Sequence, residues 1–333
     1  MLAICMTRTG GPEVLEAREL PVPELPGLQH VRVRLHAAGV NPIDAKLRKN
    51  GTYYPDRLPA VLGCDGAGVV EAVGSAVTRF RAGDEVYFFQ GGIGADAGNY
   101  AQHNVVHEAY LAHKPKNLSF TEAAAVPLAL ITAWEALYER ARLQAGERVL
   151  IHAAAGGVGH LAVQLAKLRG AQVAATVSGA DKAGYVKNLG ADKTIDYKTE
   201  DFVAAALAWT DGLGVDTTFD TVGGATFCRS FAATKVYGSV VTLLQTACEA
   251  ETVKLARLRN QTIHYELMLT PIYLGMHAAR VRQQQILKAG ARLIEEGKLK
   301  ITLSRVLPLT EAAEAHRLIE AGHTSGKIVL RIE

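Results

Sequence analysis

The first 120 residues carry a pattern of short strands. Residues 31–35 alternate apolar and polar side chains, as a half-buried strand does, and residues 66–73 and 84–89 continue with strand-like runs. Turns that contain glycine separate these runs. The pattern predicts a barrel-like β unit at the start of the chain.

From residue 148 onward the pattern changes to an alternation of strands and helices. Residues 149–151 form an aliphatic run typical of a strand buried on both faces, and residues 160–169 carry apolar side chains at helical spacing. The further predicted elements are strand 172–177, helix 181–189, strand 193–196, helix 201–209, strand 215–220, helix 225–234 and strand 238–244. This order predicts an α/β fold with a doubly wound parallel sheet, whose ligand lies at the carboxyl ends of the strands.

A glycine-rich turn joins the first strand of this region to its first helix. Residues 154–159 read AAGGVG and fit the pattern G-x-G-x-x-G with alanine in the first position. A pyrophosphate binds to exposed N–H groups at a helix N-terminus, where side chains would hold the backbone away. The turn alone could be a connection that binds nothing, but its place between strand and helix favours a dinucleotide. The predicted contacts are Ala155, Gly156, Gly157, Val158 and Gly159.

The tip of the second strand bears on the choice between NAD and NADP. NAD-selective sites place an acidic residue there to bind both ribose hydroxyls. This chain has Ser178 at the tip and Lys182 one turn further on, and both suit a phosphate. Asp181 is the competing acidic residue, but it comes a few residues late and is better explained as an acid in the first turn of a helix. We therefore predict NADP.

Composition narrows the class of protein. A length of 333 residues predicts two domains, and a formal charge of +3 with no basic run argues against nucleic-acid binding. We expect no membrane span, because no apolar stretch reaches about 18 residues, and a cytoplasmic location, because the N-terminus lacks the pattern of a signal peptide. The cysteines at positions 5, 64, 228 and 248 are too scattered for a disulfide framework, so we expect them reduced and buried.

Two polar patches in the β unit are candidates for chemistry. Residues 39–46 contain Asn41, whose amide can both donate and accept hydrogen bonds, although an Asn-Pro turn at a capped helix start explains the patch equally well. Tyr53 and Tyr54 lie beside a proline in a loop. Such a pair more often anchors a loop, but a tyrosine can also donate to a substrate carbonyl.

The C-terminal part is expected to return to the β unit. Helices are predicted at residues 283–296 and 311–321, and a closing strand at residues 326–330. The apolar side chains that could line a cleft are Leu267, Met268, Leu269, Ile272 and Tyr273, but we expect most of them to pack in the core. We predict one discontinuous domain, residues 1–123 with 271–333, and a nucleotide domain at residues 124–270.

Four motifs together resemble the medium-chain dehydrogenase/reductase superfamily, and specifically its zinc-independent quinone oxidoreductase branch. They are AAAGGVG at residues 153–159, GCDGAGVVEAVG at 63–74, GDEV at 83–86 and GKIVL at 326–330. The resemblance covers essentially the whole chain. It implies a GroES-like β-barrel catalytic domain joined to a Rossmann dinucleotide-binding domain.

The resemblance also implies a cofactor and site residues. Quinone reductases of this branch bind NADPH, and Lys182 and Tyr197 stand where the family holds the 2′-phosphate. Thr132 matches the nicotinamide contact, and Asn41 matches an asparagine beside the nicotinamide and the substrate. Tyr53 falls in the loop where several members carry a tyrosine that faces the substrate, with Tyr54 as its rival.

Departures from the zinc-dependent branch imply that no metal is bound. That branch has a cysteine ligand where this chain has the Asn41 turn, and Gly-His-Glu where it has residues 63–65. A site from Cys64, Asp65 and His103 is conceivable but disfavoured. Without a metal to lower the pKa of an alcohol, hydride should pass from NADPH to an acceptor that is already electrophilic, a quinone or an α,β-unsaturated carbonyl.

Two other functions stay open at this stage, an enoyl-thioester reductase and a low-turnover NADPH-binding redox sensor or RNA-associated relative. The first needs a tyrosine acid and room for a pantetheine arm, and the second would bind NADPH without turning over any acceptor. Relatives are often dimers that pair edge strands of their nucleotide domains. By that resemblance we expect a homodimer through residues 240–244 or 263–268.

Overall fold

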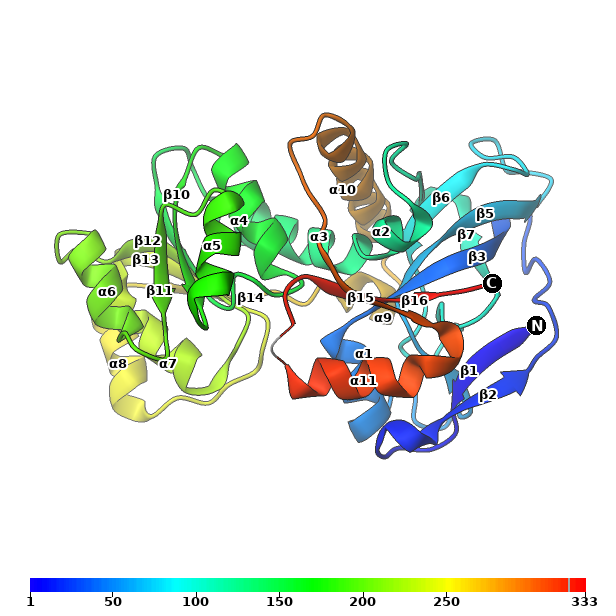
Figure 1. The fold of residues 1–333 in the computed structure, drawn as a ribbon, viewed down its shortest axis with the longest axis horizontal. Helices are drawn as coiled ribbons and strands as arrows, with labels where there is room; N and C mark the ends of the chain where they lie inside the picture. Colours follow the sequence, from blue (N-terminus) through cyan, green and yellow to red (C-terminus); the bar gives the residue numbers. More distant parts are fainter. Residues whose placement is uncertain (323) are drawn as a thin grey trace. The chain divides into compact units, whose positions relative to one another are not determined.

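The computed structural model describes residues 1–322 and 324–333, and the chain splits into two compact units (Figure 1). Unit 1 contains Met1–Ile131 and Leu269–Glu333, and unit 2 contains Thr132–Met268. The sequence-based boundaries were 123/124 and 270/271. The first division of the structure falls inside helix α3 (Pro127–Trp134), a helix that begins at a proline, as helices often do.

Unit 1 is rich in strands. In chain order its strands are β1 (Leu2–Met6), β2 (Leu15–Glu19), β3 (His30–Val40), β4 (Ala60–Val61), β5 (Asp65–Val73), β6 (Glu85–Phe89), β7 (His103–His107), β8 (Leu111–His113), β15 (Leu303–Pro308) and β16 (Lys327–Arg331). Its helical segments, besides the start of α3, are η1 (Pro12–Val14), α1 (Pro42–Asn50), η2 (Glu108–Tyr110), α2 (Phe120–Ala124), α9 (Thr270–Tyr273), α10 (His277–Glu295), η4 (Leu309–Glu311) and α11 (Ala312–Ala321).

Strand β3 organises the larger sheet of unit 1, which has the order β15-β16-β3-β5-β6-β8, with β7 also paired to β3. The smaller sheet has the order β2-β1-β4. The C-terminal strand β16 lies antiparallel to β3, with Ile328 opposite Val40 (Figure 1). This pairing brings the last strand of the chain beside the residue that follows β3, Asn41.

Unit 2 is a parallel sheet with helices on both faces. Its strands are β9 (Arg148–Ile151), β10 (Gln172–Val177), β11 (Lys193–Asp196), β12 (Val215–Asp220), β13 (Thr234–Thr242) and β14 (Thr262–Tyr265). Its helical segments, besides the end of α3, are η3 (Glu135–Arg140), α4 (Gly159–Leu168), α5 (Ala180–Asn188), α6 (Phe202–Trp209), α7 (Gly224–Ala233) and α8 (Ala250–Leu258).

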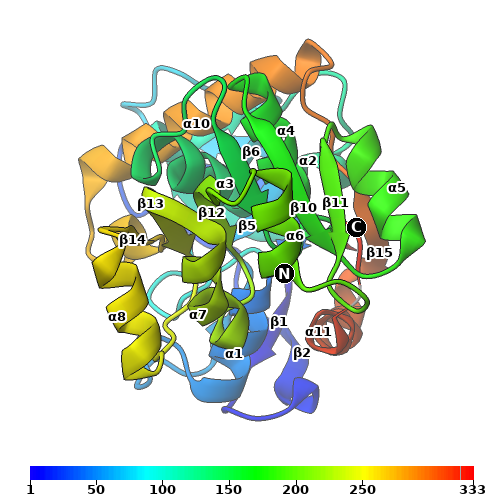
Figure 2. The ribbon, with the colours of Figure 1, turned by 90° about the vertical axis from the view of Figure 1, so that its left-hand side faces the viewer.

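The sheet order β11-β10-β9-β12-β13-β14 confirms the predicted doubly wound topology. Helices α4 and α5 cover one face, and α6, α7 and α8 pack together on the other (Figure 2). The chain moves outward in one direction from β9 and in the other from β12. The carboxyl ends of these two adjacent strands therefore border the crevice where ligands of this fold bind.

The structure corrects several expectations. A disulfide joins Cys228 to Cys248, so the prediction that these two cysteines are reduced was wrong. Cys5 and Cys64 are free and buried, as predicted. Spacing gave no sign of this pair, because α7 and the connection after β13 bring the two residues together.

Among the described residues, no helix has both the length and the apolar character needed to cross a bilayer.

Other corrections concern the segment before α10 and the strands of unit 2. Leu267 is 48% exposed and Tyr273 is 45% exposed, so core packing was the wrong prediction for these two, whereas Met268 and Leu269 are buried. Helix α10 begins at His277, before the predicted residue 283. Strand β13 begins at Thr234 and lies inside the sheet, between β12 and β14.

Candidate active site

The glycine turn of unit 2 follows β9 and is fastened to the neighbouring strand β10. The N–H of Ala153 donates to Thr176 Oγ1 at 3.1 Å, and the N–H of Ala154 donates to the Thr176 carbonyl at 3.1 Å. Ala153 has a φ of 48°, in the left-handed region that a residue with a Cβ adopts at a cost. Side-chain and backbone bonds to Thr176 thus fix the turn in an otherwise unfavoured conformation.

Steric room differs between the two ends of the turn. A Cβ at Gly159 would lie 2.4 Å from the Ala153 carbonyl oxygen, whereas at Gly156 the nearest atom, the same oxygen, would be 3.2 Å away. Within the described residues, the N–H groups of Ala155, Gly157 and Val158 have no protein acceptor. Unpartnered N–H donors at the N-terminus of a helix, here α4, are the kind of group that binds anions.

His152, which the sequence analysis did not single out, follows β9 and connects it to neighbouring elements. It is buried, and its ring nitrogens lie 3.2 Å from Thr176 Oγ1 and 3.1 Å from Ser230 Oγ. Burial lowers the pKa of His152 to about 4, so the ring is neutral and can donate from only one nitrogen. It links β9, β10 and α7 by contacts between residues far apart in sequence, which no local pattern reveals.

The predicted phosphate ligands gather at the carboxyl ends of β10 and β11. Ser178 follows β10, and Lys182 lies in the first turn of α5, both partly exposed. Tyr197 follows β11; its N–H donates to the Val177 carbonyl at 3.1 Å and its side chain is 51% exposed. The three predicted residues therefore lie at one edge, next to the tip of the second strand.

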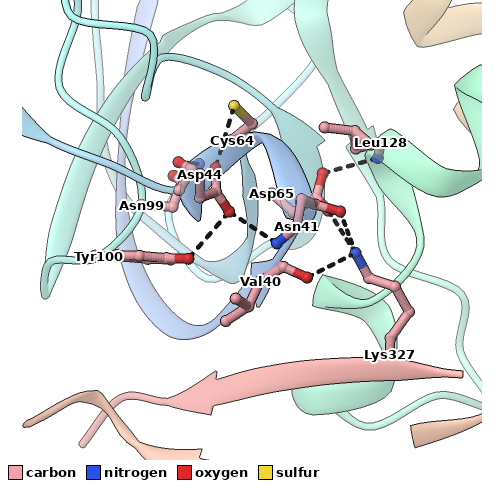
Figure 3. A network of polar contacts seen from close by, with 10 residues as sticks. Val40, Asn41, Asp44, Cys64, Asp65, Asn99, Tyr100, Leu128 and Lys327 are labelled. Atoms are coloured by element: carbon pink, nitrogen blue, oxygen red, sulfur yellow. Dashed lines mark hydrogen bonds and ion pairs between the residues drawn. The ribbon is translucent and has the colours of Figure 1, made fainter. Parts of the chain in front are cut away.

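In unit 1, Asn41 lies in a buried polar network (Figure 3). Its Nδ2 donates to Asp65 Oδ2 at 2.9 Å, and its Oδ1 accepts a hydrogen bond from Lys327 Nζ. Lys327 also donates to the Val40 carbonyl at 3.2 Å and forms an ion pair with Asp65 at 3.5 Å. The sequence predicted Asn41 as a candidate but gave no sign of its partners, which lie on β5 and β16.

Asp65 connects this network to the start of α3. Its second carboxylate oxygen, Oδ1, accepts a hydrogen bond from the N–H of Leu128 at 2.8 Å. Leu128 is the second residue of α3, so Asp65 takes the role of an N-terminal cap supplied by another strand. Thr132, the predicted nicotinamide contact, lies one turn further along the same helix and is buried.

Asp44, on the first turn of α1, is the second carboxylate of the network. It accepts hydrogen bonds from the Asn41 N–H at 2.8 Å and from the Tyr100 hydroxyl at 3.0 Å, and Cys64 Sγ lies 3.9 Å away. His316 Nε2 is 3.3 Å from the same Tyr100 hydroxyl. The predicted capped helix start is confirmed, because Asn41 caps α1. Asn41 and Asp44 also belong to a larger polar cluster that contains Tyr100 and Cys64.

Charge is unevenly balanced in the cluster, which holds two buried carboxylates and the ammonium of Lys327. Burial raises the pKa of Asp44 to about 7, and it also raises the pKa of Asp65, a change that Lys327 opposes. Burial raises the pKa of the Cys64 thiol well above its usual value and lowers the pKa of His316 to about 3, so both are neutral near pH 7. The cluster therefore retains an exchangeable proton on Asp44 close to neutrality.

These residues do not fit a zinc ion. Asp65 faces the Lys327 ammonium, and Cys64 is held as a thiol against Asp44. His103, the third member of the conceivable set, lies 3.5 Å from Glu71 instead. The described residues contain no group of three or more His, Cys, Asp or Glu side chains arranged to hold a metal.

The two loop tyrosines have different roles. The Tyr54 hydroxyl donates to the Tyr273 carbonyl at 3.2 Å, which anchors the loop to α9. The Tyr53 ring packs on the Tyr273 ring with centroids 4.9 Å apart, and its hydroxyl has no hydrogen-bond partner among the described residues. Partial burial raises the pKa of Tyr53, so this phenol stays protonated at neutral pH. Of these two tyrosines, Tyr53 is therefore the one whose hydroxyl is not used to anchor the loop.

Comparison with known proteins identifies the family. Residues 27–116 match the family model of the alcohol dehydrogenase GroES-like domain, and residues 189–330 match that of zinc-binding dehydrogenases. The chain is 39% identical over 322 residues to a quinone oxidoreductase of Pseudomonas aeruginosa, covering 96% of each chain. It is 32% identical to a 2-haloacrylate reductase of a Burkholderia species, covering 99% of this chain and 98% of the relative.

Solved structures agree with this assignment. The Escherichia coli quinone oxidoreductase in complex with NADPH superimposes with a TM-score of 0.87 at 31% identity, covering 99% of this chain and 100% of the other. An alcohol dehydrogenase superfamily protein from Novosphingobium aromaticivorans reaches a TM-score of 0.92 at 35% identity, with complete coverage of both chains. The resemblance found in the sequence is confirmed: the chain belongs to the quinone oxidoreductase branch of the medium-chain dehydrogenase/reductase superfamily and is an oxidoreductase.

Proposed function

We propose that this protein is an NADPH-dependent reductase of quinones or α,β-unsaturated carbonyl compounds. NADPH, when bound, supplies a hydride from C4 of its nicotinamide ring. The relatives named as quinone oxidoreductases and as a 2-haloacrylate reductase support an electrophilic, conjugated acceptor. The neighbour solved in complex with NADPH supports the cofactor.

Unit 2 has the features that such a cofactor requires. The backbone N–H groups of Ala155, Gly157 and Val158, which have no acceptor among the described residues, are the proposed donors to the pyrophosphate. Ser178, Lys182 and Tyr197 are the proposed ligands of the 2′-phosphate, because they follow or begin the elements at the carboxyl ends of β10 and β11 and carry a hydroxyl, an ammonium and a phenol.

The orientation of the Asn41 amide is the observation that carries the proposed chemistry. An ammonium can only donate and a carboxylate can only accept, so Lys327 fixes the amide oxygen and Asp65 fixes the amide nitrogen. With the nitrogen of the amide held by Asp65, its second N–H is the donor that it can offer to a ligand. A fixed donor stabilises negative charge that develops on a carbonyl oxygen, which a reductase of conjugated carbonyls needs.

Tyr53 and Thr132 complete the proposed set. Tyr53 keeps its proton at neutral pH and its hydroxyl is uncommitted, so we assign it to hydrogen bonding with the acceptor oxygen. Thr132 lies on the helix that Asp65 caps, and we assign it to contact with the nicotinamide. The proton for the reduced oxygen then comes from Tyr53 or from water.

An acceptor panel tests the proposal. Purified protein with saturating NADPH should oxidise it with a 1,4-benzoquinone or a simple enone, measured by the loss of absorbance at the nicotinamide band. Asn41→Ala should lower kcat by about 10²- to 10³-fold, the cost of losing one such donor. Turnover of crotonyl-CoA alone, or of no acceptor while NADPH binds, would contradict the proposal and favour the thioester reductase or the sensor.

Cofactor preference is tested at α5. Lys182→Ala should weaken NADPH binding about tenfold or more while leaving NADH binding nearly unchanged, because only NADPH carries the phosphate. Lys187→Ala, an exposed lysine on the last turn of the same helix, is the matched control and should alter neither affinity. Equal losses for both nucleotides in Lys182→Ala would refute the phosphate assignment.

We also propose a homodimer through β14. This strand lies at the edge of the unit 2 sheet and exposes Ile263 (39%) and Tyr265 (61%), whereas residues 240–244, the other predicted segment, begin inside the sheet at the end of β13. An exposed apolar edge strand is a surface suited to pairing with a second copy. Light scattering should give twice the chain mass, and Tyr265→Lys should shift it toward the monomer.

A further inference from the structure

The disulfide between Cys228 and Cys248 joins two parts of unit 2 at the carboxyl side of its sheet. Cys228 lies in α7, and Cys248 lies near the end of residues 243–249, the connection between β13 and α8. Both cysteines are only partly buried, and the contact between Cys228 Sγ and the Ala247 carbonyl, 3.7 Å, lies at an exposed position. A reversible bond requires such access.

The connection 243–249 packs against the loop that borders the crevice. The N–H of Leu243 donates to the Asp220 carbonyl at 3.1 Å, and the N–H of Gly224 donates to Thr246 Oγ1 at 3.0 Å. Asp220 and Gly224 bracket the turn that follows β12, one of the two strands at the topological switch point. The position of residues 243–249 therefore bears on the shape of the dinucleotide crevice.

The disulfide holds the end of residues 243–249 that lies closest to α8. Hydrogen bonds hold it at Leu243 and Thr246, while Gln245 and Ala247 are exposed. The helices beneath it do not depend on the disulfide, because an apolar cluster packs them against β13, formed by Phe227, Phe231, Val240 and Ala256. Opening the bond should loosen residues 243–249 and leave the fold in place.

We propose that Cys228 and Cys248 form a reversible thiol–disulfide site that sets the order of residues 243–249 and thereby the affinity of unit 2 for its dinucleotide. The partner is a dithiol reductant. Its thiolate attacks one sulfur and breaks the bond between the two cysteines, and its second thiol resolves the mixed disulfide. Two electrons and two protons pass to Cys228 and Cys248, which become thiols, and the reductant becomes a disulfide.

The disulfide form should bind NADPH more tightly, because the connection is already ordered and less conformational freedom is lost on binding. We expect the dissociation constant to rise about 5- to 20-fold on reduction, within the usual range of coupling between two sites. This expectation about NADPH rests on the proposed function. The loosening of residues 243–249 on reduction does not.

The test compares the full-length protein before and after treatment with dithiothreitol. Intact mass should rise by about 2 Da per chain, since two hydrogens are added. Hydrogen exchange of the cofactor-free protein should speed up in peptides covering residues 243–249 and stay unchanged in β9 and β10. Fluorescence titration should then show weaker NADPH binding in the reduced form.

Variants separate the disulfide from other effects of the reductant. Cys228→Ser with Cys248→Ser should exchange and bind like the reduced protein, with or without dithiothreitol, and Cys5→Ser should behave like the unsubstituted protein. Unchanged exchange of residues 243–249 on reduction would overturn the proposal, as would an unchanged NADPH affinity. If neither form bound NADPH, the proposed function would fail, and hydrogen exchange would still decide whether the disulfide orders the connection.

Discussion

The glycine turn of unit 2 and the polar network of unit 1 differ in the groups that form them. The turn consists of consecutive residues, 153–159, and offers backbone N–H groups to a ligand. The network brings together side chains from β5, α1, β16 and α11, and Asn41 and Lys327 are 286 residues apart. One site depends on steric room within a short segment, and the other depends on charge balance among distant segments.

This difference predicts how each site responds to change. Substitutions in the turn act through atoms placed too close together and should have effects that vary little with pH. Substitutions in the network alter the number of buried charges, so their effects should be larger and should depend on protonation. The following substitutions test this contrast.

Lys327→Met should have the largest effect, because it leaves Asp65 without its cation and Asn41 without the partner of its amide oxygen. Removing one partner of a buried ion pair costs about 3 to 5 kcal/mol. Urea unfolding at pH 8 measures this loss. Lys298→Met, which removes an exposed lysine paired with Glu296, is the control and should cost less than about 1 kcal/mol.

A second substitution decides whether charge causes the loss. Asp65→Asn in the Lys327→Met background removes the unpaired carboxylate and should restore part of the stability. If the double variant were as unstable as the two single losses added together, the charge argument for the network would be wrong.

Asp44→Asn should change the pH dependence of stability. The pKa of Asp44 is raised to about 7 in the folded protein, above its ordinary value of 3.8, so its protonated form is favoured by folding. The stability that this group contributes is present below about pH 4 and is lost as the pH rises to about 7. Asparagine keeps an oxygen that accepts hydrogen bonds and cannot ionise. Between about pH 4 and pH 7 the unfolding free energy of the variant should therefore rise by about 2 to 4 kcal/mol relative to that of the unsubstituted protein.

Unfolding free energies at several pH values between 4 and 8 provide the measurement. Asp56→Asn, at an exposed position of the same unit, is the control and should follow the unsubstituted protein. A constant difference between Asp44→Asn and the unsubstituted protein would show that Asp44 ionises without the burial cost assigned to it.

In the turn, Gly159→Ala should be more harmful than Gly156→Ala. A Cβ at residue 159 meets backbone atoms at 2.4 Å and 2.7 Å, whereas at residue 156 the nearest atom is 3.2 Å away. We expect Gly159→Ala to cost about 1 to 3 kcal/mol in unfolding free energy. Gly156→Ala should cost less stability than this, and under the proposed function it should weaken NADPH binding, because its Cβ would lie in the turn proposed to bind the pyrophosphate. Equal stability of the two variants would contradict this steric account.

The same contrast explains what the sequence could predict. The turn, its strand and helix, and the doubly wound order were predicted because each signal lies within one short window. Asn41 was found through its local turn, but Lys327 and Tyr100 were missed because only the pairing of β16 with β3 and the path of the chain bring them close. The Cys228–Cys248 pair was missed for the same reason, and Leu267 and Tyr273 because apolar character alone does not show exposure.

The smallest expected effect lies at the turn itself, at Ala153. Its φ of 48° costs an alanine about 1 to 2 kcal/mol, and glycine escapes that cost but loses about 0.4 to 1 kcal/mol through the greater freedom of the unfolded chain. Ala153→Gly should therefore stabilise the protein by about 0 to 1.6 kcal/mol and leave NADPH affinity unchanged, since the unpartnered N–H groups belong to later residues. Ala154→Gly, at a buried neighbour outside the left-handed region, should only destabilise. Equal destabilisation by both substitutions in urea would mean that the bonds to Thr176 select this conformation without opposing any strain.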